Sequence, residues 1–145
     1  MQTIVDLLNA VQKIDIPYLV SNALYESAEG YVRLQREQMM TGLREDGMLI
    51  FNLKTGSDQY SKSYAKKKGK TSPIDLYDTG DFQGAIFLHN DDATTFVVDS
   101  ADGKSGKLQE NYGKQIFGLD DDNKVQLKPI VQENLYNDFV NELNK

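Results

Sequence analysis

The chain has 145 residues, 39% hydrophobic and 26% charged, which is typical of one globular domain with a hydrophobic core. Its formal net charge of −6 argues against general nucleic-acid binding by net attraction, and the absence of cysteine excludes disulfides and thiolate metal sites. No segment has the roughly eighteen consecutive apolar residues of a membrane span. Because the first residues also lack the features of a signal peptide, we expect no contact with a membrane.

The first forty residues predict two helices. Apolar residues recur at helical spacing after Thr3, a residue type that caps helices, at Ile4, Leu7, Leu8 and Val11. Pro17 suits the first turn of a second, longer helix that starts at Ile16. Its apolar stripe consists of Val20, Leu24, Ala28, Tyr31 and Leu34, with Gly30 inside it and with Gly42 and Gly47 at its exit.

The middle of the chain predicts short strands. The segment "MLIFNL" (Met48–Leu53) is too short and too evenly apolar for a surface helix, so we predict a strand there. A short helix in "DQYSKSYAKKK" and a lysine-rich loop before Pro73 come next. Strand segments "IDLY" and "GAIFL" then flank the sequence Asp78-Thr79-Gly80, and "TTFVV" (Thr94–Val98) follows the polar turn "HNDDAT".

Two further helices are predicted after the strands. Leu108, Tyr112 and Ile116 lie four residues apart on one side of a helix that Gly118 could end. Pro129 is expected to open the terminal helix, in which the residues in register are Val131, Leu135, Phe139 and Leu143. The order of elements predicts one α+β domain over residues 1–145, with N-terminal helices, a small mainly antiparallel sheet and C-terminal helices.

Asp78-Thr79-Gly80 is the sequence that aspartic proteases place at their catalytic turn. Such proteases need two carboxylates that share one proton, so a single Asp-Thr-Gly would require two chains to pair. Here Asp75 and Asp81 flank the motif, which predicts a crowded acidic turn at the surface. We therefore favour a structural turn, in which Gly80 supplies the backbone conformation and Asp78 and Thr79 bond the turn.

Other motifs give no catalytic or metal-binding constellation. "DGKSGKL" (Asp102–Leu108) lacks the first glycine and the final Ser or Thr of a phosphate loop, and is expected to be a loop with a helix start. "LDDDNK" (Leu119–Lys124) lacks the glycine and the closing glutamate of a calcium loop. His89 is the only histidine, and we expect it at the surface. No catalytic residue, cofactor or metal is predicted.

Lysines concentrate in "KSYAKKKGK", where Lys66, Lys67, Lys68 and Lys70 form a candidate contact with a partner. We interpret this run as a mobile, solvated loop. Two alternatives stay open, namely contact with nucleic-acid phosphates and contact with the aspartates of a neighbouring copy of the chain.

Four segments between Tyr60 and Leu143 occur in an order that resembles the tail-completion, or neck, proteins of tailed bacteriophages. These segments are "YSKSYAKK", "SPIDLYDTGDF", "YGKQIFGL" and "LKPIVQENL". The chain departs from the family pattern at four residues. Phe82 replaces a leucine, Gly84-Ala85 replaces a polar pair, and Lys128 replaces the arginine before Pro129. It also lacks the Glu-x-Gly-Thr that precedes the last helix in that family.

The resemblance implies a non-enzymatic virion subunit without cofactor or metal. Such a subunit assembles with identical copies into a ring at the head–tail connector or tail, and contacts other neck, portal or tail proteins. It is assembled in the cytoplasm of the bacterial host, ends up in the virion, and meets DNA only as passing cargo. The alternatives are a small nucleic-acid-binding module and a homodimeric aspartic protease that uses Asp78-Thr79-Gly80.

Overall fold

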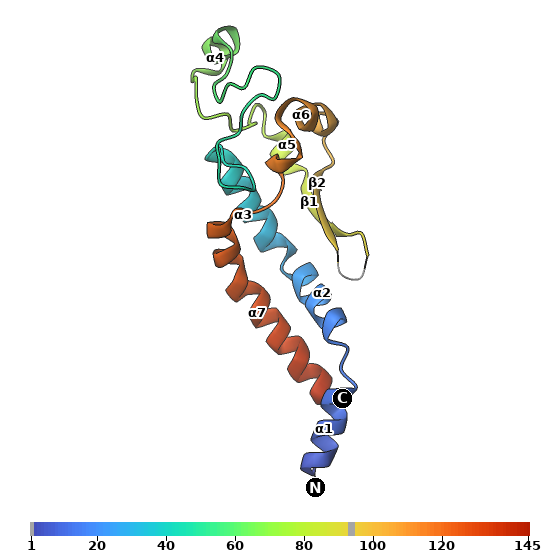
Figure 1. Cartoon of the computed structure of the whole chain (residues 1–145). Helices are drawn as coiled ribbons and strands as arrows, with labels where there is room; N and C mark the ends of the chain where they lie inside the picture. The colour runs from blue at the N-terminus through green and yellow to red at the C-terminus, as the bar shows by residue number, and fades with distance from the viewer. Residues whose placement is uncertain (1, 93–94) are drawn as a thin grey trace.

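The computed structural model describes residues 2–92 and 95–145. The molecule is elongated, with a helical stalk at one end and an irregular head at the other (Figure 1). The stalk contains α1 (Ile4–Gln12), α2 (Ile16–Glu26), α3 (Ala28–Met40) and α7 (Asp121–Leu143). Among the described residues, no helix is long and apolar enough to cross a membrane.

The predicted starts of the first two helices are confirmed. The Thr3 hydroxyl accepts the Asp6 amide at 3.1 Å and the Asp6 carboxylate accepts the Thr3 amide at 2.9 Å, which completes a capping box at α1. The Asp15 carboxylate caps α2 by accepting the amide of Tyr18, and Pro17 lies in the first turn. Short polar side chains therefore decide where both helices begin.

The prediction of one long helix from Ile16 is wrong. The segment forms two helices, α2 and α3, which are separated at Ser27. The buried Ser27 hydroxyl donates to the carbonyl of Ala23 at 2.6 Å and accepts a hydrogen bond from the side-chain amide of Asn134 at 2.8 Å. A serine that bonds back to the preceding turn bends a helix, so the chain changes direction between α2 and α3. Gly30 is not the break, and it allows close packing on α7, because a Cβ there would lie 3.2 Å from Ile130.

The prediction that Pro129 opens the terminal helix is wrong. The helix α7 begins eight residues earlier, where the carboxylate of Asp120 accepts the amide of Asn123 at 2.9 Å, and Pro129 lies inside it. A proline inside a helix removes one amide donor and crowds the carbonyl four residues before it, so the helix needs stabilisation from packing. Packing of Leu127 and Val131 against Leu34 of α3 holds the helix on both sides of Pro129.

The head contains the remaining elements. They are α4 (Lys62–Lys68), α5 (Asp81–Gly84), β1 (Ile86–Asn90), β2 (Phe96–Ser100), α6 (Ser105–Tyr112) and the 3-10 helix η1 (Lys114–Ile116). The strands β1 and β2 pair antiparallel, with Ile86 opposite Ser100 and Asn90 opposite Phe96, and α3 packs against β1. The chain is an α+β protein with helices at both ends, as the sequence predicts.

Two predicted strands are wrong, because Met48–Leu53 and residues 74–77 belong to no sheet, although Leu49 forms an isolated antiparallel bridge with Leu43. Their backbone groups bond to several segments rather than to one neighbouring strand. The amide of Ile50 donates to the carbonyl of Gly42 and that of Leu53 donates to the carbonyl of Asn111, both at 2.8 Å. Their apolar residues are nevertheless in the core, where Ile50 and Ile74 are buried.

The boundaries of three other elements also differ from the prediction. The short helix α4 is confirmed within the predicted segment "DQYSKSYAKKK". It contains Lys66, Lys67 and Lys68, so the interpretation of these lysines as a loop is wrong. The helix α6 ends at Gly113, whose φ of +88° stops it before Ile116 and Gly118. The strand β2 begins at Phe96, and the earlier part of the predicted strand at Thr94 lies outside the described residues.

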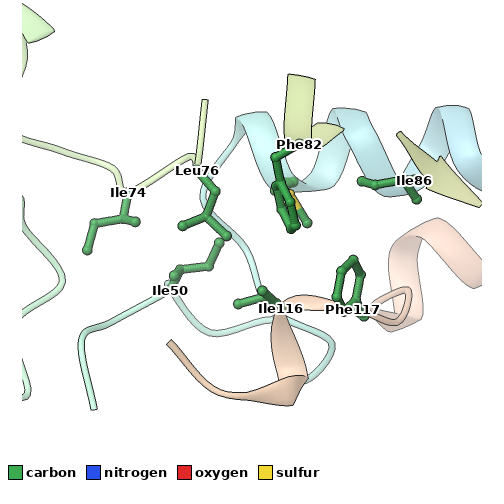
Figure 2. Close-up of a cluster of buried hydrophobic side chains, with 8 residues drawn as sticks. Ile50, Ile74, Leu76, Phe82, Ile86, Ile116 and Phe117 are labelled. Atoms are coloured by element: carbon green, nitrogen blue, oxygen red, sulfur yellow. The ribbon is translucent and has the colours of Figure 1, made fainter. Parts of the chain in front are cut away.

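The main core lies in the head and is built from segments that are distant in the sequence. Figure 2 shows side chains from α3, the irregular segments, α5, β1 and η1 pointing toward one another. The rings of Phe82 and Phe117 lie 5.8 Å apart. The buried set is Met39, Ile50, Ile74, Leu76, Phe82, Ile86, Ile116 and Phe117.

Two buried glutamines of α3 join the stalk to the head. The amide group of Gln35 donates to the carbonyl of Ile116 at 3.2 Å and accepts the amide of Gly118 at 2.8 Å. Gln38 donates to the carbonyl of Gly118 at 2.9 Å and accepts the amide of Asp120 at 2.8 Å. These bonds satisfy the backbone between η1 and α7, which has no helical partner there.

Candidate functional site

A buried carboxylate lies beneath the Asp-Thr-Gly turn. Asp75 is 2% exposed, and its side chain accepts the hydroxyl of Tyr60 at 2.9 Å and the amide of Tyr77 at 3.0 Å. The ammonium of Lys68 lies 3.0 Å from the same carboxylate, and that of Lys70 donates to it from the other side. We call the group formed by Tyr60, Lys68, Lys70 and Asp75 the Asp75 clasp.

The clasp keeps Asp75 ionised. Burial disfavours the charged form of a carboxylate, but the hydrogen bonds from Lys70, the Tyr77 amide, Lys68 and Tyr60 favour it more, so the pKa of Asp75 falls from 3.8 to about 2. The prediction of a crowded acidic surface around this residue is therefore wrong. Asp75 is buried and paired with cations, and it anchors the turn from below.

Tyr60 is the centre of the clasp. Its hydroxyl donates to Asp75 and lies 3.1 Å and 3.2 Å from the backbone amides of Asp75 and Leu76, which both donate to it. Leu76 has a φ of +56°, a conformation that non-glycine residues rarely adopt. Burial of the ring, together with the neighbouring Asp75 carboxylate, raises the pKa of Tyr60. The hydroxyl thus holds a strained backbone segment in place.

The Asp-Thr-Gly segment itself is an exposed turn that leads into α5. Gly80 has a φ of +89°, and a Cβ at this position would lie 3.1 Å from the ring of Tyr77. The hydroxyl of Thr79 accepts the amide of Asp81 at 3.4 Å, and the side chains of Asp78 and Thr79 lie at the surface. Asp78 and the lysine-paired Asp75 therefore do not form a carboxylate pair that shares a proton within one chain.

A hollow of about 690 Å³ opens beside this turn. We call it the tyrosine pocket, because three tyrosines line it. Its aromatic and aliphatic lining includes Tyr60, Tyr64, Leu76, Phe82, Leu108 and Tyr112. Thr79 also lines it, and its charged lining is balanced, with two lysines and two aspartates, namely Lys104, Lys107, Asp78 and Asp81. Its volume is within the range of ligand-binding pockets. No pattern along the chain predicts this pocket, because its lining comes from three separate segments, residues 52–64, 74–82 and 104–112.

The four lysines singled out in the sequence have two different environments. Lys68 and Lys70 bind Asp75, and the ammonium of Lys68 also lies 5.1 Å from the centre of the Tyr60 ring. Lys66 and Lys67 are exposed in the last turn of α4. Only the second pair is positioned to contact a partner without loss of a buried ion pair.

Other candidate residues occupy ordinary structural positions. His89 is exposed on β1, with its ring 5.4 Å from that of Phe87. Asp120 caps α7, while Asp121 and Asp122 lie in its first turn. Carboxylates at this end stabilise a helix by interacting with the positive end of its dipole. Within residues 2–92 and 95–145, no group of three acidic or histidine side chains is arranged to hold a metal ion.

Comparisons of this chain with protein-family models, with curated proteins and with solved structures give no match.

Proposed function

We propose that the chain is a non-enzymatic structural subunit of a tailed-phage virion, which assembles into a ring at the head–tail connector or tail. The observation that carries the proposal is the amount of apolar surface that a single copy leaves uncovered along its stalk. Exposed large side chains there include Ile4, Val5, Leu8, Ile16, Tyr18 and Tyr25. Apolar patches of this extent mark interaction surfaces, so the fold is expected to be completed by its neighbours.

The segments that resemble phage neck proteins also support the proposal, because three of them pack together in the head. "YSKSYAKK" (Tyr60–Lys67) supplies Tyr60 of the clasp and most of α4, and "SPIDLYDTGDF" supplies Asp75 and the turn. "YGKQIFGL" supplies Ile116 and Phe117 to the same core, and the residues after it open α7. The fourth segment, "LKPIVQENL", lies inside α7 of the stalk. Three of the four segments therefore build the head.

A nucleic-acid-binding module is the second candidate. The observation that favours it is the exposure of Lys66 and Lys67 at the outer end of the head, in a segment where residues 54–70 hold six lysines and one aspartate. Cations in such numbers bind phosphates by releasing counterions. The net charge of −6 and the acidic loops elsewhere on the chain favour the ring subunit over this candidate.

The two candidates are separated by measuring assembly and DNA binding on the same preparation. We expect light scattering to give a mass several times 16.4 kDa with rising protein concentration, and negative-stain images to show closed rings. We expect no binding of duplex DNA at physiological salt. A chain that stays monomeric and binds DNA tightly would replace the ring proposal with the nucleic-acid one.

A further inference from the structure

The first helix lies on the stalk with its polar side inward. Asp6, Asn9, Ala10 and Lys13 line a hollow of about 430 Å³ that they share with the end of α7 at Glu142, Leu143 and Lys145. The apolar side of the helix points the other way. We call that side, formed by Ile4, Leu7, Leu8 and Val11, the outward stripe.

The outward stripe is uncovered in a single copy. Ile4 is 79% and Leu8 54% exposed, and none of the nine residues of α1 is buried. A helix of this length is marginally stable in water and normally gains its stability by burying an apolar face. Apolar exposure continues along α2 at Ile16 and Val20, one turn apart. A partner surface is therefore needed to cover α1.

The charges near the stripe favour a basic protein surface over a membrane. Helices that lie on membranes carry several Lys or Arg residues on their polar face. Residues 2–26 instead carry three acids, Asp6, Asp15 and Glu26, and one base, Lys13, a net charge of −2. The complementary surface is on the same chain, because residues 54–70 carry a net charge of +5. Without Lys68 and Lys70, which are paired with Asp75, this segment keeps a net charge of +3 beside the tyrosine pocket. Two lysines and two aspartates line the pocket wall itself, so the basic surface is the rim formed by residues 54–67; the four are Lys104, Lys107, Asp78 and Asp81.

We propose that the outward stripe of α1 docks into the tyrosine pocket of a second copy of the chain. The stripe would supply aliphatic side chains to a pocket walled by aromatic and aliphatic residues, as an amphipathic helix does in a groove. A chain cannot fill its own pocket, because α1 and α4 lie at opposite ends of the molecule (Figure 1). The inference rests on the proposed ring subunit and identifies the contact between neighbouring copies. We call this contact between the outward stripe and the tyrosine pocket the joint.

The joint is heterologous, since the two surfaces in contact are different. Each copy offers one stripe and one pocket, so a third copy can add to the second in the same way. Such contacts close into a ring when the rotation between copies allows it. A symmetric contact between two stripes would instead stop at a dimer.

The first test compares Leu8→Glu with Gln12→Glu in the full chain. Both variants add one negative charge to α1, but only the first lies on the stripe, and both residues are exposed. Burying a leucine is worth enough that we expect Leu8→Glu to raise the dissociation constant between copies at least about tenfold. Gln12→Glu should change it less than about threefold, and both variants should melt like the wild type.

The second test uses the absence of native cysteine. Differently tagged Leu8→Cys and Thr79→Cys chains are mixed and oxidised, and Tyr136→Cys, exposed on α7, replaces Leu8→Cys as the control. We expect the mixed disulfide with Thr79→Cys to form several times faster from Leu8→Cys than from Tyr136→Cys. Equal rates, or preferred Leu8→Cys homodimers, would overturn the proposed joint.

These outcomes separate failure of the joint from failure of the ring. If the wild type assembles and Leu8→Glu assembles equally well, the joint is wrong and the ring proposal stands. If the wild type stays monomeric and no mixed disulfide forms, both are wrong. Binding of the wild type, but not of Leu8→Glu, to vesicles of phosphatidylcholine and phosphatidylglycerol would overturn the joint in favour of a lipid surface.

Discussion

The hydroxyl of Tyr60 donates to the carboxylate of Asp75 at 2.9 Å while it accepts the backbone amide of the same residue at 3.1 Å. Tyr60→Phe removes these two bonds and the one from the amide of Leu76, and leaves buried polar groups with one partner fewer. We expect it to lower the free energy of unfolding by about 1–3 kcal/mol in urea melts. Tyr64→Phe is the control, because Tyr64 is partly exposed in α4, and it should change the melt by less than about 0.5 kcal/mol. Equal effects would show that the clasp does not depend on the Tyr60 hydroxyl.

The clasp also predicts how stability depends on pH. The folded pKa of Asp75, about 2, is below its usual value of 3.8, so its stabilising effect is complete above pH 4 and is lost as the pH falls toward 2. The shift corresponds to about 2 kcal/mol. Urea melts of the wild type and Asp75→Asn at pH 7, 4 and 2.5 should show a stability difference that shrinks at the lowest pH. A constant difference would mean that the lysines do not stabilise the ionised carboxylate.

Glycine at position 80 is required by the backbone, whereas the aspartate of the same motif is not. Gly80→Ala places a Cβ at a φ of +89° and 3.1 Å from Tyr77, so we expect a loss of about 1–2 kcal/mol. Gly84→Ala is the control, because a Cβ there meets no atom within 4 Å. Asp78→Asn should leave stability and assembly nearly unchanged. Pepstatin-sensitive proteolysis by the wild type that disappears in Asp78→Asn would instead make the motif catalytic.

Mutation of the exposed lysines, Lys66 and Lys67, is expected to have a different effect from mutation of Lys68 and Lys70. Lys66→Glu with Lys67→Glu should leave the melt of the single copy unchanged, because both side chains are exposed, but should weaken assembly that depends on salt. Lys68→Glu with Lys70→Glu should lower stability by about 3–5 kcal/mol, since it places acids beside buried Asp75. Circular-dichroism melts and light scattering between 50 and about 500 mM salt measure both effects. Equal melts would show that Lys68 and Lys70 behave as a solvated loop.

The core helices should differ in their tolerance of truncation. Leu34→Ala in α3 removes a fully buried side chain, and we expect it to lower stability by about 2–5 kcal/mol. Leu135 and Phe139 in α7 are only half-buried in one copy, so truncation of either to alanine should cost less in the isolated chain. A loss at Leu135 that grows with protein concentration would place that side chain in an interface between copies.

The sequence predicted those parts of the fold whose signals are local. Thr3 and Pro17 define the starts of two helices because a cap or a fixed φ acts within one turn. The strand predictions around Ile50 and Ile74 were wrong. An apolar segment joins a sheet only if its backbone amides find partners on a neighbouring strand, and those partners are distant in the sequence. The prediction that Pro129 begins the last helix was wrong because Asp120 caps that helix earlier in the chain.

The candidate site was harder to predict than the fold. Lys68 and Lys70 appear in a run of like residues that is typical of solvated loops, and nothing local distinguishes them from Lys66 and Lys67. Their role depends on Asp75 being buried by the core, which is a tertiary effect. The tyrosine pocket is also a product of packing and has no signature along the chain.

The side-chain amides of Gln35 and Gln38 fix both the position and the rotation of α3 relative to the head. Apolar contacts alone would let the stalk turn or slide against the head at small cost, because they have no preferred direction. Each glutamine instead both donates to and accepts from the backbone between residues 116 and 120, and a shift of α3 by one residue would leave several buried groups unpaired. A rotation of the stalk is therefore expected to move the head with it.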